Sequence, residues 1–68
     1  MGKIPIDLRR VLVSTPKAKV IWEGLTPDAR RDFVRWIDLA KESEARGVRI
    51  AKVCVMLAAG KRHPVVES

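Results

Sequence analysis

The sequence predicts an all-α protein, a small single-domain bundle of about four helices, two short and then two long. Apolar residues recur at helical spacing in four consecutive segments. Prolines and glycines fall where those segments begin and end. No segment alternates apolar and polar residues as a half-buried strand would. The 68 residues, 47% hydrophobic and 32% charged, have the composition of one globular domain.

The first two helices are predicted to be short. Ile4–Ser14 begins at Pro5, and its apolar residues fall at positions i, i+3 and i+4: Leu8, Val11 and Leu12. Thr15 is predicted to cap the second helix, Pro16–Glu23, and Gly24 to end it in a left-handed conformation. The apolar face of this helix comprises Ala18, Ile21, Trp22 and Leu25.

The third helix lies within Leu25–Ala40 and has the clearest start signal in the chain. Thr26 is a suitable N-cap, and Pro27 suits the first helical position. One apolar face is formed by Ala29, Phe33, Trp36, Ile37 and Ala40. We expect Phe33 and Trp36 to be the most buried large side chains of this helix and the centre of the core.

The fourth helix is predicted over Glu44–Ala59, with Ser43 as its cap and Gly60 as its stop. Its core face consists of Ile50, Val53, Cys54 and Leu57, with Ala51, Val55 and Ala58 beside it. The predicted domain covers residues 4–60, and residues 61–68 are expected to form a basic, mobile tail.

The net charge of +6 is distributed unevenly along the chain. Residues 1–22 and 45–66 are strongly basic, whereas residues 23–44 mix both signs. The predicted partner-binding residues are the basic side chains on and after the fourth helix: Arg46, Arg49, Lys52, Lys61 and Arg62. No acidic residue lies between Arg46 and Arg62, so these cations are expected to lack internal partners and to be available to an acidic partner. The alternative is an ordinary solvated face whose aliphatic stems cover apolar neighbours.

Residues suited to catalysis are few. His63 is the single histidine, and no nucleophile or carboxylate near it in the sequence completes a catalytic arrangement. Cys54 falls on a predicted core face, where a thiol is inert. The chain has too few clustered ligands for a metal site and no glycine-rich phosphate loop. We therefore expect no enzyme, no catalytic or metal-binding residue and no cofactor.

The longest apolar run, Val53–Ala59, is far shorter than the roughly 20 residues that span a bilayer. The first ten residues lack the apolar region of a signal peptide, which predicts a cytoplasmic location. The alternative function is a nucleic-acid-binding module that meets phosphates through the same basic residues, Arg46, Arg49, Lys52, Lys61 and Arg62. The second and third helices could also form a helix-turn-helix. Asp28 and Asp32 at the start of the third helix would, however, repel phosphates.

The segments IPIDLRRVL and TPKAKVIWEGLTPDARRDFVRWIDLAKESEARGVRIAKVCVMLAAGK, together about Ile4 to Arg62, resemble the bacteriocin-protection, YdeI/OmpD-associated protein family (OmdA). The most specific parts are LTP before RRDFVRWI, and RIAKVCVML followed by AAGK. Three positions depart from the family pattern: Ser43 replaces a common proline, Gly47 falls in a helix, and Val48 replaces a second basic residue.

The resemblance implies a bacterial protein linked to tolerance of bacteriocins or cationic antimicrobial peptides and to association with an outer-membrane porin. It carries no agreed catalytic residues. Members often join this helical segment to a second, β-rich domain. The sequence and the resemblance together predict a non-catalytic protein-interaction module. Its expected partner is an acidic protein surface, its own upstream domain or an envelope protein.

Overall fold

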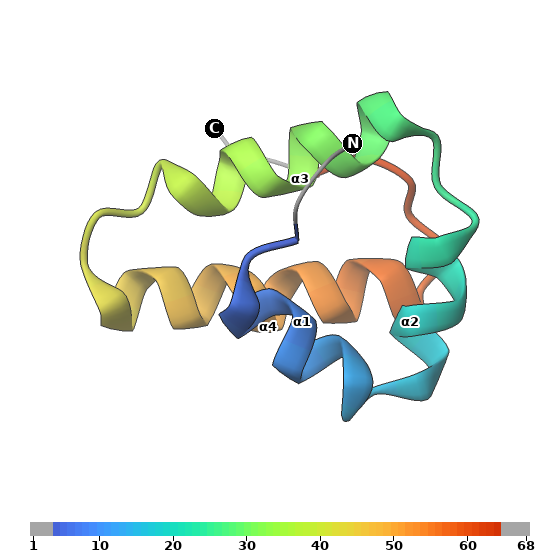
Figure 1. Ribbon diagram of the computed structural model, residues 1–68, viewed down its shortest axis with the longest axis horizontal. Helices are drawn as coiled ribbons and strands as arrows, with labels where there is room; N and C mark the ends of the chain where they lie inside the picture. The colour runs from blue at the N-terminus through green and yellow to red at the C-terminus, as the bar shows by residue number, and fades with distance from the viewer. Residues whose placement is uncertain (1–3, 65–68) are drawn as a thin grey trace.

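The computed structural model describes residues 4–64, and these form helices joined by short turns, with no strand (Figure 1). The helices are α1 (Ile6–Val13), α2 (Pro16–Glu23), α3 (Pro27–Asp38) and α4 (Ser43–Ala58). The predicted all-α bundle of two short and two long helices is therefore confirmed for this part of the chain.

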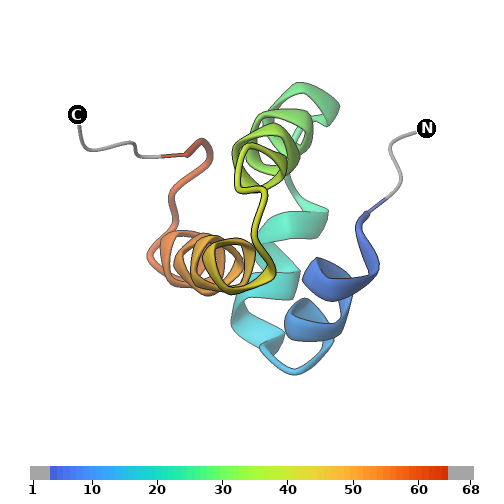
Figure 2. The same ribbon diagram turned by 90° about the vertical axis from the view of Figure 1, so that its left-hand side faces the viewer.

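Helix α4 is the centre of the arrangement, because it contacts each of the other three. Helix α3 runs antiparallel to α4 and beside it, while α1 and α2 pack against another side of α4 (Figures 1 and 2). The four apolar faces therefore meet around a single helix, and its inner face carries most of the inter-helix packing.

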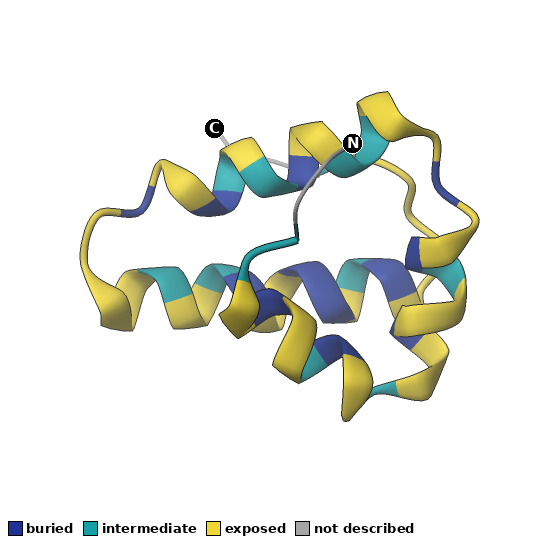
Figure 3. Cartoon of the chain, in the orientation of Figure 1, coloured by how far each residue is buried: buried dark blue, intermediate teal, exposed yellow. Residues whose placement is uncertain are grey.

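The buried positions are spread over all four helices (Figure 3). The core that they form is entirely apolar, since no polar or charged residue is buried in the described part of the chain. Trp22 and Phe33 form its aromatic centre, with ring centroids 6.3 Å apart and planes tilted by 49°. Such a pair contributes about 0.5–1.5 kcal/mol beyond the burial of its surface. The core cluster comprises Leu8, Leu12, Ala18, Trp22, Leu25, Phe33, Ile37, Ile50, Val53, Cys54 and Leu57.

The prediction for the aromatic residues of α3 is half right. Phe33 is fully buried, as expected, but Trp36 is only partly buried and packs at the edge of the core. Its place in the interior is taken by Trp22 of α2 and by Ile37 of α3. Helical spacing places Trp36 on the apolar side of α3, but its indole lies at the edge of that side, where the Arg49 side chain covers it.

Two predicted helix ends are confirmed. The backbone N–H of Ala29 donates to Thr26 Oγ1 at 3.2 Å, which makes Thr26 the cap of α3. Gly60 has a φ of +84°, a conformation that side chains with a Cβ rarely adopt. The N–H groups of Lys61 and Gly60 bond to the carbonyls of Met56 and Leu57, both at 2.9 Å. This is a Schellman motif, which ends α4 sharply.

Three other predicted capping features are wrong, although α2 spans Pro16–Glu23 as expected. The Thr15 hydroxyl donates to the Val11 carbonyl at 2.9 Å, so it closes the end of α1 and does not cap α2. Gly24 has a right-handed φ of −86°, which any residue can adopt. Ser43 is the first residue of α4, and the cap position is taken by Glu42 without a side-chain hydrogen bond. Residue type favours a cap at these positions, but a Ser or Thr hydroxyl can bond to another backbone group instead, as Thr15 does.

The outer side of α4 also differs from the prediction. Ala51, Val55 and Ala58 were expected beside the core face but are exposed. At about 100° per residue, Val55 points roughly 200° away from the fully buried Val53, which places it opposite the core. Of the predicted tail, residues 61–64 are described, and the expectation for residues 65–68 lies outside the described residues.

Candidate interaction surface

The five basic residues predicted to bind a partner divide into two groups in the structure. Arg46 and Arg49 are partly buried and engage other helices, whereas Lys52, Lys61 and Arg62 are exposed. Residues three apart on a helix point about 60° away from each other around its axis. Arg46, Arg49 and Lys52 therefore point in successively different directions, from the core side toward the outer side of α4. The sequence places them in a row, but the structure does not bring all five onto one surface.

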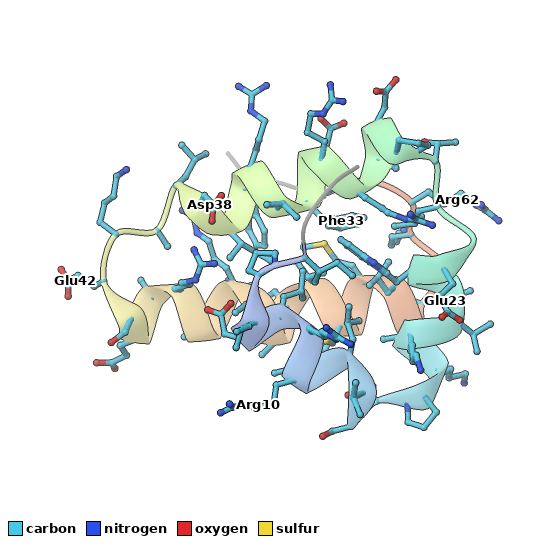
Figure 4. All side chains as sticks on the ribbon, viewed as in Figure 1. Arg10, Glu23, Phe33, Asp38, Glu42 and Arg62 are labelled. Atoms are coloured by element: carbon cyan, nitrogen blue, oxygen red, sulfur yellow. The ribbon has the colours of Figure 1, made fainter. Side chains whose placement is uncertain are left out.

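Arg46 joins three helices through two ion pairs. Its Nε and Nη2 atoms donate to Asp7 Oδ2 and Oδ1 of α1, at 2.5 and 3.3 Å. Its Nη1 atom donates to Asp38 Oδ1 at the end of α3, at 2.7 Å. Figure 4 labels Asp38 on the part of α3 that lies above the start of α4. The expectation that the cations of α4 lack acidic neighbours is wrong for Arg46, because its partners come from distant sequence positions.

The ion pairs shift the pKa values of the Asp7 carboxyl and the Arg46 guanidinium. The hydrogen bond from Arg46 lowers the pKa of the Asp7 carboxyl below its ordinary value of 3.8. The same hydrogen bond to Asp7, together with that to Asp38, raises the pKa of the already basic Arg46 guanidinium. The Asp7 carboxylate also accepts the N–H of Leu8 at 2.9 Å in the first turn of α1, where negative charge is favoured.

Arg49 is held against α3 by the half-buried indole of Trp36. Its guanidinium carbon lies 5.0 Å from the centroid of the Trp36 ring, within the range of a cation–π interaction. Its Nη1 atom donates to the Trp36 carbonyl at 2.6 Å. Arg49 therefore covers the exposed side of Trp36 and helps to hold α3 on α4.

Lys52, Lys61 and Arg62 form no ion pair or side-chain hydrogen bond within residues 4–64. Lys52 lies on the outer flank of α4, and the other two follow its C-terminal end, where Figure 4 labels Arg62. Positive charge near the C-terminus of a helix is favoured by the helix dipole. These three side chains are the cations of the predicted set whose charge faces solvent.

An apolar strip lies beside these cations on the outer side of α4. Val48 and Val55 are 51% and 69% exposed, and Ala51 and Ala58 between and beyond them are exposed as well. A helix that is apolar on both sides is usually covered on both sides. Sequence reasoning placed Ala51, Val55 and Ala58 beside the core and did not assign Val48 to either side. Val48 and Val55 are seven residues apart, so they lie on one side of the helix, roughly opposite Val53. This spacing is the signal that could have revealed the strip.

A second surface feature is an open cavity of about 770 Å³ between α1, α2 and the start of α3. Arg30 is fixed at its edge, because its Nε and Nη2 donate to the carbonyls of Trp22 and Glu23 at 3.2 and 2.9 Å. Arg30 thus closes the end of α2, a role that sequence reasoning missed. The residues lining the cavity are Ile4, Arg9, Leu12, Val13, Lys19, Trp22, Glu23 and Arg30.

The candidate reactive side chains lie away from this cavity. Cys54 is buried on the inner face of α4, as expected, and burial raises the pKa of its thiol. His63 is exposed in the segment after α4. Residues 4–64 contain no group of three or more histidine, cysteine or acidic side chains placed to hold a metal ion.

None of the helices described between residues 4 and 64 is long and apolar enough to cross a membrane.

Comparison with known proteins gives a family match and no individual relative. No curated protein and no solved structure matches the chain significantly. Residues 2–60 match the family described as "Bacteriocin-protection, YdeI or OmpD-Associated". The match spans all four helices and most of the chain, and it agrees with the resemblance seen in the sequence. The chain therefore belongs to the bacteriocin-protection, YdeI or OmpD-associated (OmdA) family.

Proposed function

We propose that the chain is a non-catalytic protein-interaction module that binds an acidic partner through the outer surface of α4. This outer surface is defined here as the apolar strip and the three exposed cations: Val48, Ala51, Val55, Ala58, Lys52, Lys61 and Arg62. The observation that supports it most directly is the exposure of two valines on one side of a helix whose other side is core. Exposed apolar strips with a polar rim are typical of protein interfaces.

The charge of the outer surface favours an acidic partner. Its cations are unpaired within the described residues, so a carboxylate that approaches them displaces no internal partner. Long-range attraction to these cations would speed association and help to orient the partner. Arg46 and Arg49, by contrast, are held by α1 and α3, and we assign them a structural role within the domain.

The family description names association with OmpD, and this motivates an envelope protein as one candidate partner. The test is capture of partners from separated envelope and soluble fractions of the native bacterium by the purified chain, at low and high salt. Lys52→Glu combined with Lys61→Glu should reduce capture at least tenfold and leave the helical circular dichroism unchanged. Capture by the unmodified chain should weaken at high salt.

The matched control is Arg31→Glu combined with Arg35→Glu, which reverses two exposed charges on α3. This control should capture partners as the unmodified chain does. If the control loses capture and the α4 variant retains it, the interaction surface lies on α3 and the proposal is wrong.

Nucleic acid is a weaker candidate partner. Asp28 and Asp32 are exposed at the start of α3, where a recognition helix would approach phosphates. We expect only weak binding to a DNA duplex, without sequence preference and falling steeply with salt. A defined footprint on a duplex at physiological salt would contradict the proposed function.

A further inference from the structure

The outer side of α4 has the spacing of a two-helix seam. Glu44, Val48, Ala51, Val55 and Ala58 follow one another at alternating intervals of four and three residues. This is the interval pattern that keeps one side of a helix facing a second helix along its whole length. All five residues are exposed, so no other part of residues 4–64 covers this side.

The charges at the two ends of α4 have opposite signs. Glu42 and Glu44 are exposed at its start, and Lys61 and Arg62 are exposed just beyond its end. Figure 4 labels Glu42 and Arg62 at opposite ends of the helix. An identical helix laid alongside in the antiparallel direction would therefore bring acidic ends beside basic ends twice, whereas a parallel one would bring like charges together.

From this complementarity we infer that the outer surface of α4 docks on the same surface of a second copy of the chain, in an antiparallel two-fold arrangement. The inference rests on the proposed function, because it identifies the partner of the same surface. The acidic groups that meet Lys61 and Arg62 are then Glu42 and Glu44 of the other copy.

The seam residues support one register. When Val48 of one copy faces Ala58 of the other, Ala51 faces Val55, and the two-fold symmetry repeats both contacts. Each layer then combines one valine with one alanine. Facing large and small residues in this way lets two helices approach closely without leaving voids.

The same geometry limits the strength of the dimer. A single helix pair buries a small area, so dissociation constants roughly between 10 µM and 1 mM are expected. Lys52 lies on the flank of the seam near its middle, and the two copies of this cation approach each other across the two-fold axis. Their repulsion weakens the dimer and provides a test.

Sedimentation equilibrium of the purified chain across that concentration range should show the average mass rising from 7.6 kDa toward twice that value. Val48→Glu combined with Val55→Glu should keep the helical circular dichroism but stay monomeric. The control is Val20→Glu on α2, a valine 66% exposed, which should dimerise normally. A chain that remains monomeric at about 1 mM overturns the inference.

Disulfide trapping tests the direction of pairing. In the proposed register, a mixture of the Ala51→Cys and Val55→Cys proteins should cross-link to each other, while neither should cross-link to itself. Self-cross-linking of either protein alone would indicate a parallel seam and contradict the inference. The native thiol, Cys54, is buried and serves as an internal blank in the unmodified chain.

Lys52→Gln separates the inference from the proposed function. It removes a repulsion between two copies, so dimerisation should tighten severalfold. It also removes an attraction to any other acidic partner, so capture of such a partner should weaken. A monomeric chain that still captures an acidic partner through Lys52 would overturn the dimer and leave the proposed function standing.

Discussion

Helices α3 and α4 bury similar apolar faces against each other but present opposite characters to solvent. The outer side of α3 carries exposed charges of both signs, including an Asp28–Arg31 pair with 3.9 Å between Oδ1 and Nη1. The outer side of α4 carries exposed valines and alanines with Lys52 on its flank. The comparison shows that α3 needs no further cover, whereas α4 retains a surface suited to a second contact.

The largest effect is expected in the shared core of the two helices. Phe33→Ala should cost about 3–5 kcal/mol, comparable to the roughly 3–5 kcal/mol that a domain of this size has in total. The variant should lose its helical signal at 25 °C. Trp36→Ala removes a half-buried ring from the same helix and should still give a cooperative thermal transition. An unfolded Trp36→Ala variant beside a folded Phe33→Ala variant would reverse our assignment of the aromatic centre.

The second test compares the two sides of α4 directly. Val53 is fully buried and Val55 is 69% exposed, only two residues apart. Val53→Ala should reduce the free energy of unfolding by about 2–3 kcal/mol, and Val55→Ala should change it by less than about 0.5 kcal/mol. Urea unfolding at low protein concentration measures both. Equal losses would mean that the outer side of α4 is covered within the monomer.

Replacing the glycine within α4 and the glycine just after it by alanine should change the free energy of unfolding in opposite directions. Gly47 is helical, and a Cβ placed on it would meet no atom within 4 Å, so Gly47→Ala should stabilise the chain by about 0.5–1 kcal/mol. Gly60 has a φ of +84°, so Gly60→Ala should destabilise it by about 1 kcal/mol. Thermal melts of both variants, recorded under one set of conditions, check the signs.

The smallest effect concerns the ion pairs that tie α4 to α1. Because Arg46 lowers the pKa of Asp7, folding favours the ionised carboxylate. The stabilisation is present above the unfolded pKa near 4 and is lost as the pH falls through the lower folded pKa. The Asp7 side chain is 46% exposed, so the contribution is at most about 1 kcal/mol.

Asp7→Asn should therefore be less stable than the unmodified chain at pH 7. The difference should shrink as the pH is lowered from 7 toward 2, because the stabilising charge on Asp7 is lost as the pH falls through its lowered folded pKa. Asp28→Asn, at a residue with a side chain 89% exposed, is the control and should change little at either pH. A deficit for Asp7→Asn that persists at low pH would point to a cause other than charge.

Sequence reasoning found the helices because prolines and apolar spacing act locally. Thr26 and Gly60 were predictable since each acts within a few residues of its own position. The partners of Arg46 were not, because Asp7 lies 39 residues away and meets it only in the folded chain. The candidate surface was found in part. Lys52 was named, but Val55 was expected beside the core, because apolar residues on both sides of a helix do not show which side is buried.

The central position of α4 has a consequence for how the chain is made. Helices α1, α2 and α3 are synthesised before α4, yet each of them packs against α4. Until residues such as Val53 and Leu57 have emerged, the earlier helices lack the surface that covers their apolar faces. Folding should therefore be a late, single event that follows translation of α4. A nascent chain stopped before that helix would be a target for chaperones and proteases.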